Sequence, residues 1–395
     1  MVTDFYYPST GGIETHIRYL SKSLIERGHK VIIITHSARN MDESPEFEDL
    51  KVYALNLPIV AMNTSFPTLF SNFLIYKKIF SEESIDIVHG HQSMSNLCLE
   101  GIFHGRTLNL RTVLTEHSLF EERPFENIIV NTLTKFILKT VDRCICVSQT
   151  SKENLHKRTE ISLEKITVIQ NGVISEKFYP PREVSKGKKI IVMSRLVYRK
   201  GIDLLVQAIP IICDSDKEIN IFIAGDGPKI DEIQQVIDEN DLSERVSIVG
   251  EIKHSEVGDF LRSGDVFLNT SLTETFCMAI LEASMCGLHV VSTNVGGIHE
   301  VLPKELITFA KPTSEDLAIK VMEAVNNVDK ETILAKYSFL KEKYSWNSIA
   351  EKTENLYCGI EHTEMTIVER LCLYNHVFEH FLIILEYVWL YFLSK

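Results

Sequence analysis

The sequence predicts an α/β protein built from two doubly wound Rossmann-like domains, and three observations support this fold class. The chain has 395 residues, which is more than one compact core of ordinary size uses. Short apolar segments rich in Ile and Val recur along it, as in strands buried on both faces of a parallel sheet. Stretches with helical character lie between these segments, as β-α-β units require.

The expected strands fall into two sets. The first set lies at residues 31–35, 85–89, 112–115, 143–147 and 166–169. The second set lies at residues 189–193, 219–224, 246–249, 266–269, 288–292 and 306–309. A polar segment that begins with two prolines, residues 180–189, separates them and indicates a linker. We therefore expect one domain at 1–182 and a second at 183–345, and only residues 1–3 remain for a short first strand.

Composition excludes some classes of protein. The formal charge of −13 argues against a general nucleic-acid binder, because binding to a phosphate backbone needs clustered cations. A few well-placed cations still suffice to hold one diphosphate. The eight cysteines contain no C-x-x-C pair and lie mostly in apolar runs, which favours a reducing compartment. No signal peptide precedes the motifs, so we expect the bulk of the chain to face the cytosol.

Two loops carry features that suit a phosphate. Gly11 and Gly12 precede a predicted helix at 15–27, so backbone N–H groups and the helix N-terminus can approach an anion, although an ordinary turn has the same pattern. Arg195 and Lys200 follow the strand at 189–193 and supply a forked donor and a point charge. A solvated basic loop is the alternative reading. The position after a strand favours a diphosphate site.

The segment 271–282 follows the strand at 266–269 and contains Glu274 and Glu282. Thr273 is expected to cap a helix here, with the amides of Thr275 and Phe276 free to meet a phosphate. The axial rise between the two carboxylates is then about 12 Å, which does not suggest the carboxylate pair of a hydrolase. We expect Glu274 to contact a sugar and Glu282 to accept from ribose hydroxyls, unless both are surface acids.

Two further groups of residues lie at strand ends. Gly225 and Gly227 form a tight turn after 219–224, and the turn is expected to line a nucleotide pocket. A dinucleotide fingerprint is excluded, because glycine does not follow at the required spacing. His89, His91 and His117 follow strands of the first half, and we expect no metal because a fourth ligand has no useful spacing. His117 is the candidate for contact with a sugar.

Together these motifs resemble the retaining GT-B glycosyltransferases of family 4. The likeness rests on four motifs in order and extends to about residue 359: Gly11-Gly12-x-Glu14, Arg195-x₄-Lys200-Gly201, Gly225-Asp226-Gly227-Pro228 and Glu274-x₇-Glu282. The finer strings 194–205, 267–274 with 276–280, and 291–293 with 295–298 resemble the branch that transfers N-acetylglucosamine from UDP-GlcNAc to phosphatidylinositol, the first step of GPI-anchor synthesis.

The resemblance implies a GT-B fold in which an acceptor domain and a nucleotide-sugar domain face a central cleft. It implies that Arg195 and Lys200 hold the diphosphate, Glu282 the ribose, Glu274 the donor sugar, Gly12 the phosphate-facing loop and His117 the reacting sugar. It further implies transfer with retention and without a metal cofactor. Members of this branch work with other membrane subunits at the endoplasmic reticulum membrane, with the catalytic domains on the cytosolic face.

The C-terminal region is read in two parts. Residues 346–360 resemble the family's closing helix, which crosses back to the first domain. Residues 361–395 are expected to form a membrane-associated tail with an apolar helix at 377–393, where Glu379 and Glu386 interrupt the apolar run. This helix is transmembrane, interfacial or bound to a partner. The apolar stretch 66–80 is read either as a bilayer contact or as a core helix.

Two rival functions stay open from the residues alone. A family 4 transferase with another donor sugar or acceptor would carry the same motifs, because sugar choice depends on a few polar contacts. A protein that binds nucleotide sugar without turnover, as a non-catalytic subunit, is the alternative of another class.

Overall fold

A computed structural model shows the fold, and it divides into two compact units. The first unit comprises Met1–Gln170 and Ile349–Lys395, and the second comprises Asn171–Ser348. The described residues are 1–7, 11–36, 50–61, 64–66, 68, 71–120, 128–181, 187–327, 329–361, 364–374 and 376–393. Residues 182–186, which are part of the expected linker, therefore lie outside the described residues.

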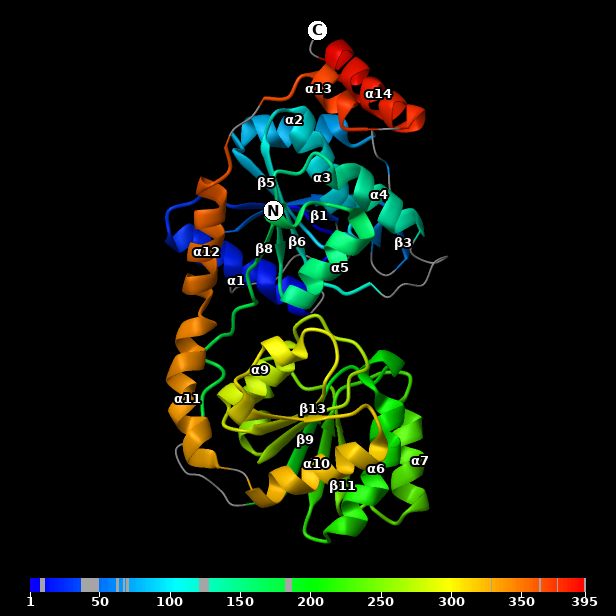
Figure 1. Ribbon diagram of the computed structural model, residues 1–395, viewed down its shortest axis with the longest axis vertical. Coiled ribbons are helices and arrows are strands. Elements are labelled where there is room, and N and C mark those ends of the chain that lie inside the picture. The colour runs from blue at the N-terminus through cyan, green and yellow to red at the C-terminus, as the bar shows by residue number, and fades with distance from the viewer. Residues whose placement is uncertain are drawn as a thin grey trace. The chain divides into compact units, whose positions relative to one another are not determined.

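The first unit alternates strands and helices along the chain (Figure 1). Its elements are α1 (Gly12–Glu26), β1 (Ile32–His36), β2 (Lys51–Leu55), β3 (Ile59–Ala61), β4 (Thr64–Ser65), α2 (Phe73–Glu82), β5 (Ile87–His91), α3 (Asn96–Thr107), β6 (Arg111–Glu116), α4 (Ile128–Leu138), β7 (Arg143–Cys146), α5 (Gln149–Thr159), β8 (Ile166–Val168), α13 (Ile367–Cys372) and α14 (Val377–Leu393). The helix α12 (Trp346–Cys358) begins in the second unit and ends in the first.

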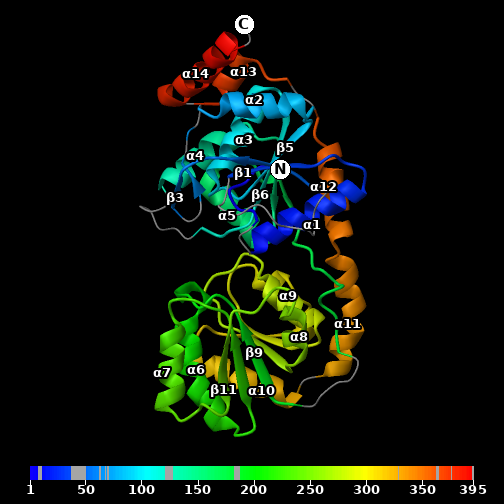
Figure 2. The same cartoon turned by 180° about the vertical axis from the view of Figure 1, so that it is seen from behind.

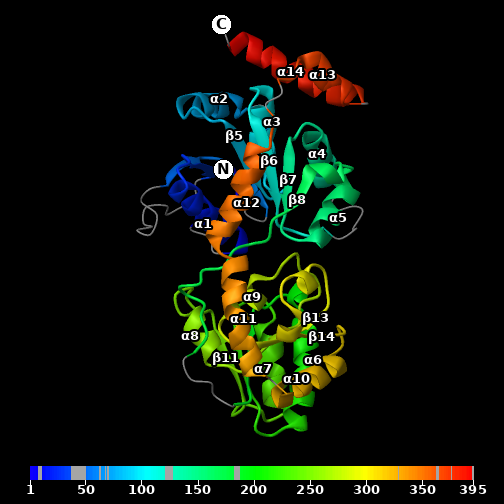
Figure 3. The ribbon, with the colours of Figure 1, turned by 60° about the vertical axis from the view of Figure 1, so that its left-hand side comes forward.

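The parallel sheet of the first unit is completed by the N-terminal residues. β1 pairs with β2, and β5, β6, β7 and β8 pair in that order. Val2 forms parallel bridges to Ile34 of β1 and to Gly90 of β5, so it fills the place of a central strand. The expected short first strand is thus confirmed, and it joins the two halves of this sheet. Figure 3 shows α5 beside β7 and β8, against which it packs.

The second unit is a six-stranded parallel sheet with the order β11-β10-β9-β12-β13-β14. Its elements are β9 (Lys189–Met193), η3 (Tyr198–Lys200), α6 (Ile202–Ser215), β10 (Asn220–Ala224), α7 (Ile230–Glu239), β11 (Val246–Gly250), α8 (Val257–Arg262), β12 (Val266–Asn269), α9 (Met278–Met285), β13 (His289–Thr293), η4 (Ile298–Glu300), β14 (Ile307–Ala310), α10 (Ser314–Asn327) and α11 (Lys330–Lys343). Helices α6, α7 and α10 lie on one face, and α8 and α9 lie on the other (Figures 1 and 2).

The central strands bury both faces, as the sequence predicts, whereas the edge strand β11 exposes Ser247 and Val249. In the second unit Ile190, Val192, Ile221, Ile223 and Leu268 form one core cluster with the inner side of α6. Burying one such side chain contributes roughly 1.5–3 kcal/mol, so the doubly wound arrangement follows from strands that have no polar face to expose. All eleven expected strands are present, with ends shifted by at most two residues.

The C-terminal tail packs on the first unit through α13 and α14. Tyr374 and Ile383 belong to the same core cluster as Phe136 and Cys144. Among the described residues, the structure contains no helix with both the length and the apolar character needed to cross a membrane. The transmembrane reading of 377–393 therefore receives no support. The stretch 66–80 contains α2, whose Phe73, Tyr76, Ile79 and Phe80 are buried, in agreement with the core-helix reading.

A buried polar network links the tail to α3. His104 Nδ1 lies 2.7 Å from Glu386 Oε1, and Arg370 Nη2 lies 3.5 Å from Glu386 Oε2. All three side chains are fully buried. Arg370 also donates to Thr107 Oγ1 and lies over the ring of Phe103. The acid that interrupts the apolar run in the sequence is therefore the buried partner of two basic side chains.

We predict that Glu386→Ala destabilises the chain by about 3–5 kcal/mol, because it leaves a buried guanidinium without its carboxylate partner. Glu379→Ala serves as the control, because its ion pair with Lys139 is partly exposed and is expected to contribute less than about 1 kcal/mol. Urea unfolding of both variants measures the difference. Equal losses in the two variants would contradict the role given to the buried network.

Candidate functional site

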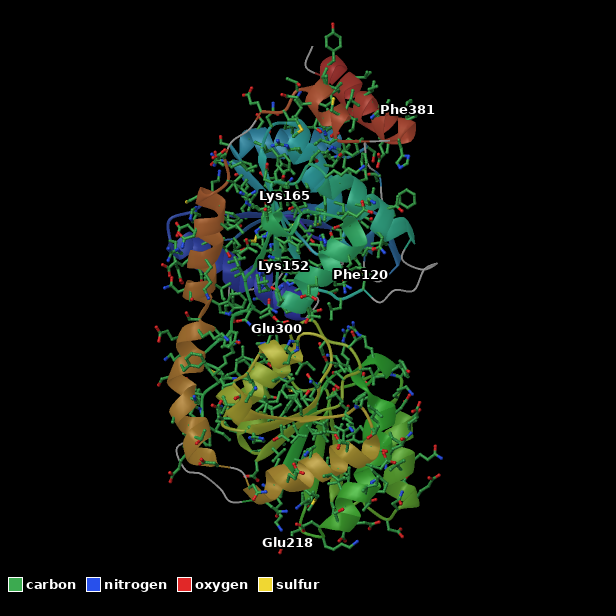
Figure 4. All side chains as sticks on the ribbon, viewed as in Figure 1. Phe120, Lys152, Lys165, Glu218, Glu300 and Phe381 are labelled. Carbon is green, nitrogen blue, oxygen red and sulfur yellow. The ribbon has the colours of Figure 1, made fainter. Side chains whose placement is uncertain are left out.

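In the second unit the sequence-predicted residues gather at the carboxyl ends of the parallel strands. Glu218, just before β10, and Glu300, after β13, mark the two opposite ends of this unit in Figure 4. The loops after β9, β10, β12 and β13 all open at the end marked by Glu300. Ligands of open parallel sheets bind at this end of the strands.

Arg195 borders a cavity of about 370 Å³ between the loops after β9 and β10. The turn after β10 contributes Gly225 and Gly227 to its lining, as expected. Both glycines have positive φ, and an added Cβ would lie 1.9 Å from the carbonyl oxygen of Ser194 and 2.4 Å from that of Leu196, respectively. Only glycine permits this close backbone approach. The glycines therefore shape the cavity by letting two loops touch.

Lys200 and Glu274 form an ion pair between the loops after β9 and β12. Their side chains are only 18% and 12% exposed. Ser271 Oγ lies 3.0 Å from the same carboxylate oxygen of Glu274. Gly201, which precedes α6, has φ +68°, and a Cβ there would lie 1.8 Å from the carbonyl oxygen of Thr270. The sequence placed both charges at this edge, but it did not predict that they pair with each other.

The predicted N-cap at Thr273 is wrong. α9 begins at Met278, and its N-cap is Cys277 with φ +67° and no capping hydrogen bond from its side chain. Thr275 and Phe276 precede the helix in an irregular segment with buried side chains. The backbone N–H of Gly297 donates to the carbonyl oxygen of Glu274 at 2.9 Å, so contacts with the neighbouring loop hold this segment outside the helix. Tertiary contacts therefore outweigh the local preference of Thr273 for the N-cap position of a helix.

Glu282 lies on α9, where burial raises the pKa of its carboxyl to about 7. In the described part of the chain, no hydrogen bond to this carboxyl is found. Desolvation without a compensating donor has this effect on an acid. A carboxyl group with a strongly shifted pKa at the ligand end of a sheet is a candidate binding residue.

Arg199 adds a cation that the sequence motifs did not single out for a role. Burial and the neighbouring charge of Arg195 lower the pKa of the Arg199 guanidinium, while Glu274 opposes that shift. Arg195, Arg199 and Lys200 therefore place three positive charges on one loop, and Glu274 offsets one of them. This excess of positive charge suits a diphosphate.

In the first unit, Gly11 is the N-cap of α1 in an extended conformation, and Gly12 begins the helix. Residues 8–10 of the predicted phosphate loop lie outside the described residues. A Cβ added at Gly12 would meet nothing within 4 Å, so backbone crowding does not require glycine there. Gly11 has no side chain, and among the described residues no side-chain hydrogen bond caps this end of α1.

Four histidines of the first unit, His16, His89, His91 and His117, form one cluster at the carboxyl ends of β5 and β6. His91 Nδ1 lies 3.2 Å from His117 Nε2, and the ring of His16 on α1 makes an edge contact with that of His117. His89 stacks on His91 and is held at both ring nitrogens, by Tyr357 Oη and by Thr115 Oγ1 at 2.6 Å each. Burial lowers the pKa of His89, His91 and His117 well below the usual value, so these rings are neutral at pH 7.

Glu116 positions His117, and sequence reasoning missed it. Its buried carboxylate accepts from the backbone N–H groups of His117 and Ser118 at 3.1 and 3.2 Å. It also accepts from Ser93 Oγ and pairs with Arg158. A buried carboxylate with this many donors is rigidly held. The sequence feature that could have identified Glu116 is its position at the end of a strand, directly before His117.

Comparison with known proteins identifies the family. Residues 10–177 match the family described as Glycosyltransferase Family 4, and residues 174–341 match Glycosyl transferases group 1. Among solved structures, the Anabaena protein HepE in complex with UDP aligns with TM-score 0.73 at 17% identity, covering 89% of this chain and 97% of that one. Sucrose-phosphate synthase from Thermosynechococcus elongatus aligns with TM-score 0.70 at 21% identity over 88% and 93% of the two chains. These likenesses show a GT-B-like fold.

Curated relatives are closer in sequence. The phosphatidylinositol N-acetylglucosaminyltransferase gpi3 subunit of Schizosaccharomyces pombe is 41% identical, over 95% of this chain and 83% of the relative. A phosphatidylinositol N-acetylglucosaminyltransferase subunit of Homo sapiens is 42% identical, over 90% of this chain and 75% of the relative. Identity at this level over nearly the whole chain establishes common family membership. This chain therefore belongs to the gpi3 family of phosphatidylinositol N-acetylglucosaminyltransferase subunits, within the family 4 glycosyltransferases.

Proposed function

We propose that this chain transfers N-acetylglucosamine from UDP-GlcNAc to phosphatidylinositol, the first step of GPI-anchor synthesis. One observation carries the proposal: Arg195, which borders the cavity, shares a loop with Lys200 of the Lys200–Glu274 pair, at the ligand end of the sheet in the second unit. The named reaction of the relatives and their 39–42% identity support the choice of sugar and acceptor.

The second unit supplies the groups for the donor's leaving diphosphate. In this proposal Arg195 and Lys200 bind the phosphates, and the turn at Gly225 and Gly227 lines the nucleotide pocket. Backbone amides at Thr275 and Phe276 add further donors, and Glu282 accepts from the ribose. When the sugar–oxygen bond breaks, negative charge develops on the β-phosphate, and fixed cations stabilise that charge without a metal.

Glu274 has two roles in the proposal. It holds Lys200 at the phosphate through their ion pair, and its second carboxylate oxygen is available to a sugar hydroxyl. The first unit contributes Gly11 and Gly12 toward phosphate and His117 toward the reacting sugar. The neutral imidazole of His117 can accept or donate one hydrogen bond. Retention is then assigned to attack of the inositol hydroxyl from the side of the departing phosphate.

The assay that tests this function presents labelled nucleotide sugars to the purified chain, with its membrane subunits where needed, and vesicles containing phosphatidylinositol. We expect label from UDP-GlcNAc to enter the lipid. Exclusive use of GDP-mannose would reassign the donor. Binding of UDP-GlcNAc without any turnover would instead favour a non-catalytic nucleotide-sugar-binding subunit.

We further propose that the chain works at the endoplasmic reticulum membrane, with both units on the cytosolic face and with partner subunits. An exposed apolar stripe on α14 supports contact with the bilayer surface. Val377, Phe381, Ile384, Val388 and Tyr391 repeat at helical spacing and are all exposed, while Ile383 and Glu386 face the protein core. Phe381 is labelled on this helix in Figure 4. A helix of this kind lies in the plane of an interface.

Lys200→Ala is predicted to lower kcat/KM for transfer by about 100-fold or more, because it removes a cation that stabilises the leaving phosphate. Circular dichroism is expected to show an intact fold, since the side chain contributes one ion pair and little packing. Lys188→Ala is the matched control: Lys188 pairs with Asp216 and Glu218 at the opposite end of the sheet. Undiminished transfer by Lys200→Ala would refute the assignment.

UDP affinity is predicted to rise by up to about tenfold between pH 6 and pH 8, because the ionised Glu282 is a stronger acceptor for the ribose hydroxyls than the protonated acid and its ionised fraction grows through a pKa of about 7. Titration calorimetry at several pH values measures this change. UDP itself titrates in part of this range, so Glu282→Gln is the reference that isolates the contribution of the protein. Parallel pH profiles for the two proteins would rule out the ribose contact.

The double substitution Phe381→Asp and Ile384→Asp is predicted to reduce binding to phosphatidylinositol vesicles at least about fivefold, because it places charges in the apolar face that enters the interface. Vesicle flotation measures the bound fraction. Glu364→Asp, a conservative change in the same tail, is the control. Unchanged flotation together with a lost complex would show that a partner protein covers the stripe.

A further inference from the structure

Three histidines of the first unit lie in the arrangement of metal ligands. One ring nitrogen each from His16, His91 and His117 falls within 4.8 Å of the other two. The three residues come from separate elements, α1, the end of β5 and the residue after β6, which the parallel sheet holds together. The set differs from the trio considered in the sequence, because both nitrogens of His89 already have partners and His16 takes its place.

The distances agree with coordination. His91 Nδ1 and His117 Nε2 are 3.2 Å apart. Two nitrogens bound to one tetrahedral zinc ion at about 2.0–2.1 Å lie roughly 3.3 Å from each other. A small movement of the His16 ring would complete the third position. The site is therefore nearly formed without rearrangement of the backbone.

A second observation also points to a ligand. His91 Nε2 is buried and has no hydrogen-bond partner among the described residues, while Nδ1 faces His117. An unpaired buried polar atom costs free energy in either tautomer. A cation bound at Nε2 would relieve that cost by taking the lone pair of this atom, whereas a cation bound at Nδ1 would take the place of the contact with His117 and leave the cost at Nε2 unchanged. The stack of His89 on His91 keeps the ring in place for this contact.

We propose that His16, His91 and His117 form a binding site for one late first-row divalent metal ion of the Zn²⁺ class. Three imidazole donors without a carboxylate exclude Mg²⁺ and Ca²⁺, which prefer oxygen ligands. Burial lowers the pKa of His91 and His117, which favours the neutral form that binds metal. Glu116 does not join the set, because its carboxylate oxygens are occupied by four donors of the protein. The fourth position on the metal is left to an exogenous ligand.

Metal analysis of the full chain tests the site directly. After dialysis against a chelator and titration with Zn²⁺, we expect about one bound equivalent per chain and a higher Tm. His16→Gln and His91→Gln are each expected to lower metal affinity by about 10-fold or more. His299→Gln is the control, because His299 is exposed in the second unit. Stoichiometry and affinity unchanged in both cluster variants would overturn the proposal.

Cobalt provides a readout that does not depend on a variant that folds. Co²⁺ bound by three imidazoles in the unaltered chain is expected to give visible absorption bands, which added Zn²⁺ removes. No bands at saturating Co²⁺ would also overturn the proposal. Bands that remain in the two cysteine variants Cys358→Ser and Cys372→Ser support the histidine site, because these exposed thiols are the competing ligands.

Metal occupancy also bears on catalysis, and this consequence rests on the proposed function. A metal on His117 would withdraw its lone pair from the sugar, so saturating Zn²⁺ is expected to reduce transfer at least about tenfold, reversibly with chelator. Zn²⁺ binding without inhibition would support the metal site and remove His117 from sugar recognition. An active transferase that binds no Zn²⁺ would leave the proposed function intact and overturn the metal site.

Discussion

Close contact between the backbones of neighbouring loops is the constraint on which the candidate site depends. In the second unit, the loops after β9, β10 and β12 approach so closely that Gly201, Gly225 and Gly227 have no room for a Cβ. These contacts set the positions of Arg195 and Lys200 relative to the turn that lines the cavity. Because the backbone itself holds the cations, the positive charge is in place before the diphosphate of the proposed donor would bind, and such preorganisation is what electrostatic stabilisation requires.

Burial determines the charge of the remaining candidate residues. It keeps His117 and His91 neutral, and it raises the pKa of Glu282 into the physiological range. Burial also disfavours the ionised carboxylates of Glu116 and Glu386, but basic or backbone donors surround each of them. A buried acid surrounded by donors organises the structure, whereas a buried acid without them is poised to accept a ligand.

The C-terminal helix α14 has one side packed on the first unit and another side exposed to solvent. The inner side of α14 supplies Ile383 and Glu386 to the first unit, and its outer side presents apolar side chains to solvent. A mostly apolar sequence of this length suggests a membrane span when only its hydropathy is considered. The tertiary contacts of Glu386 with His104 and Arg370 explain why an acid is tolerated in it.

Much of the fold follows from local sequence. Runs such as 189–193 and 266–269 are apolar on both faces, so they form buried parallel strands wherever they lie in the chain. The residues at the carboxyl edge of the second sheet were also predictable, because Arg195, Lys200, Gly225 and Glu274 each follow a strand. The length of the helix at 377–393 was predicted for the same reason, since its apolar run has clear ends.

The sequence by itself determined the eleven expected strands and which end of each sheet the candidate residues follow, because those depend on residue periodicity and on short segments; β2, β3 and β4 were not expected from it. Only the tertiary structure decided the partners: Lys200 with Glu274, Glu116 with His117, and His16 with His91. It also moved the start of α9 from Thr273 to Met278, because contacts with the loop after β13 outweigh the local capping preference. Contacts between residues far apart in the chain depend on how the elements pack in three dimensions, and a local sequence pattern does not predict that packing.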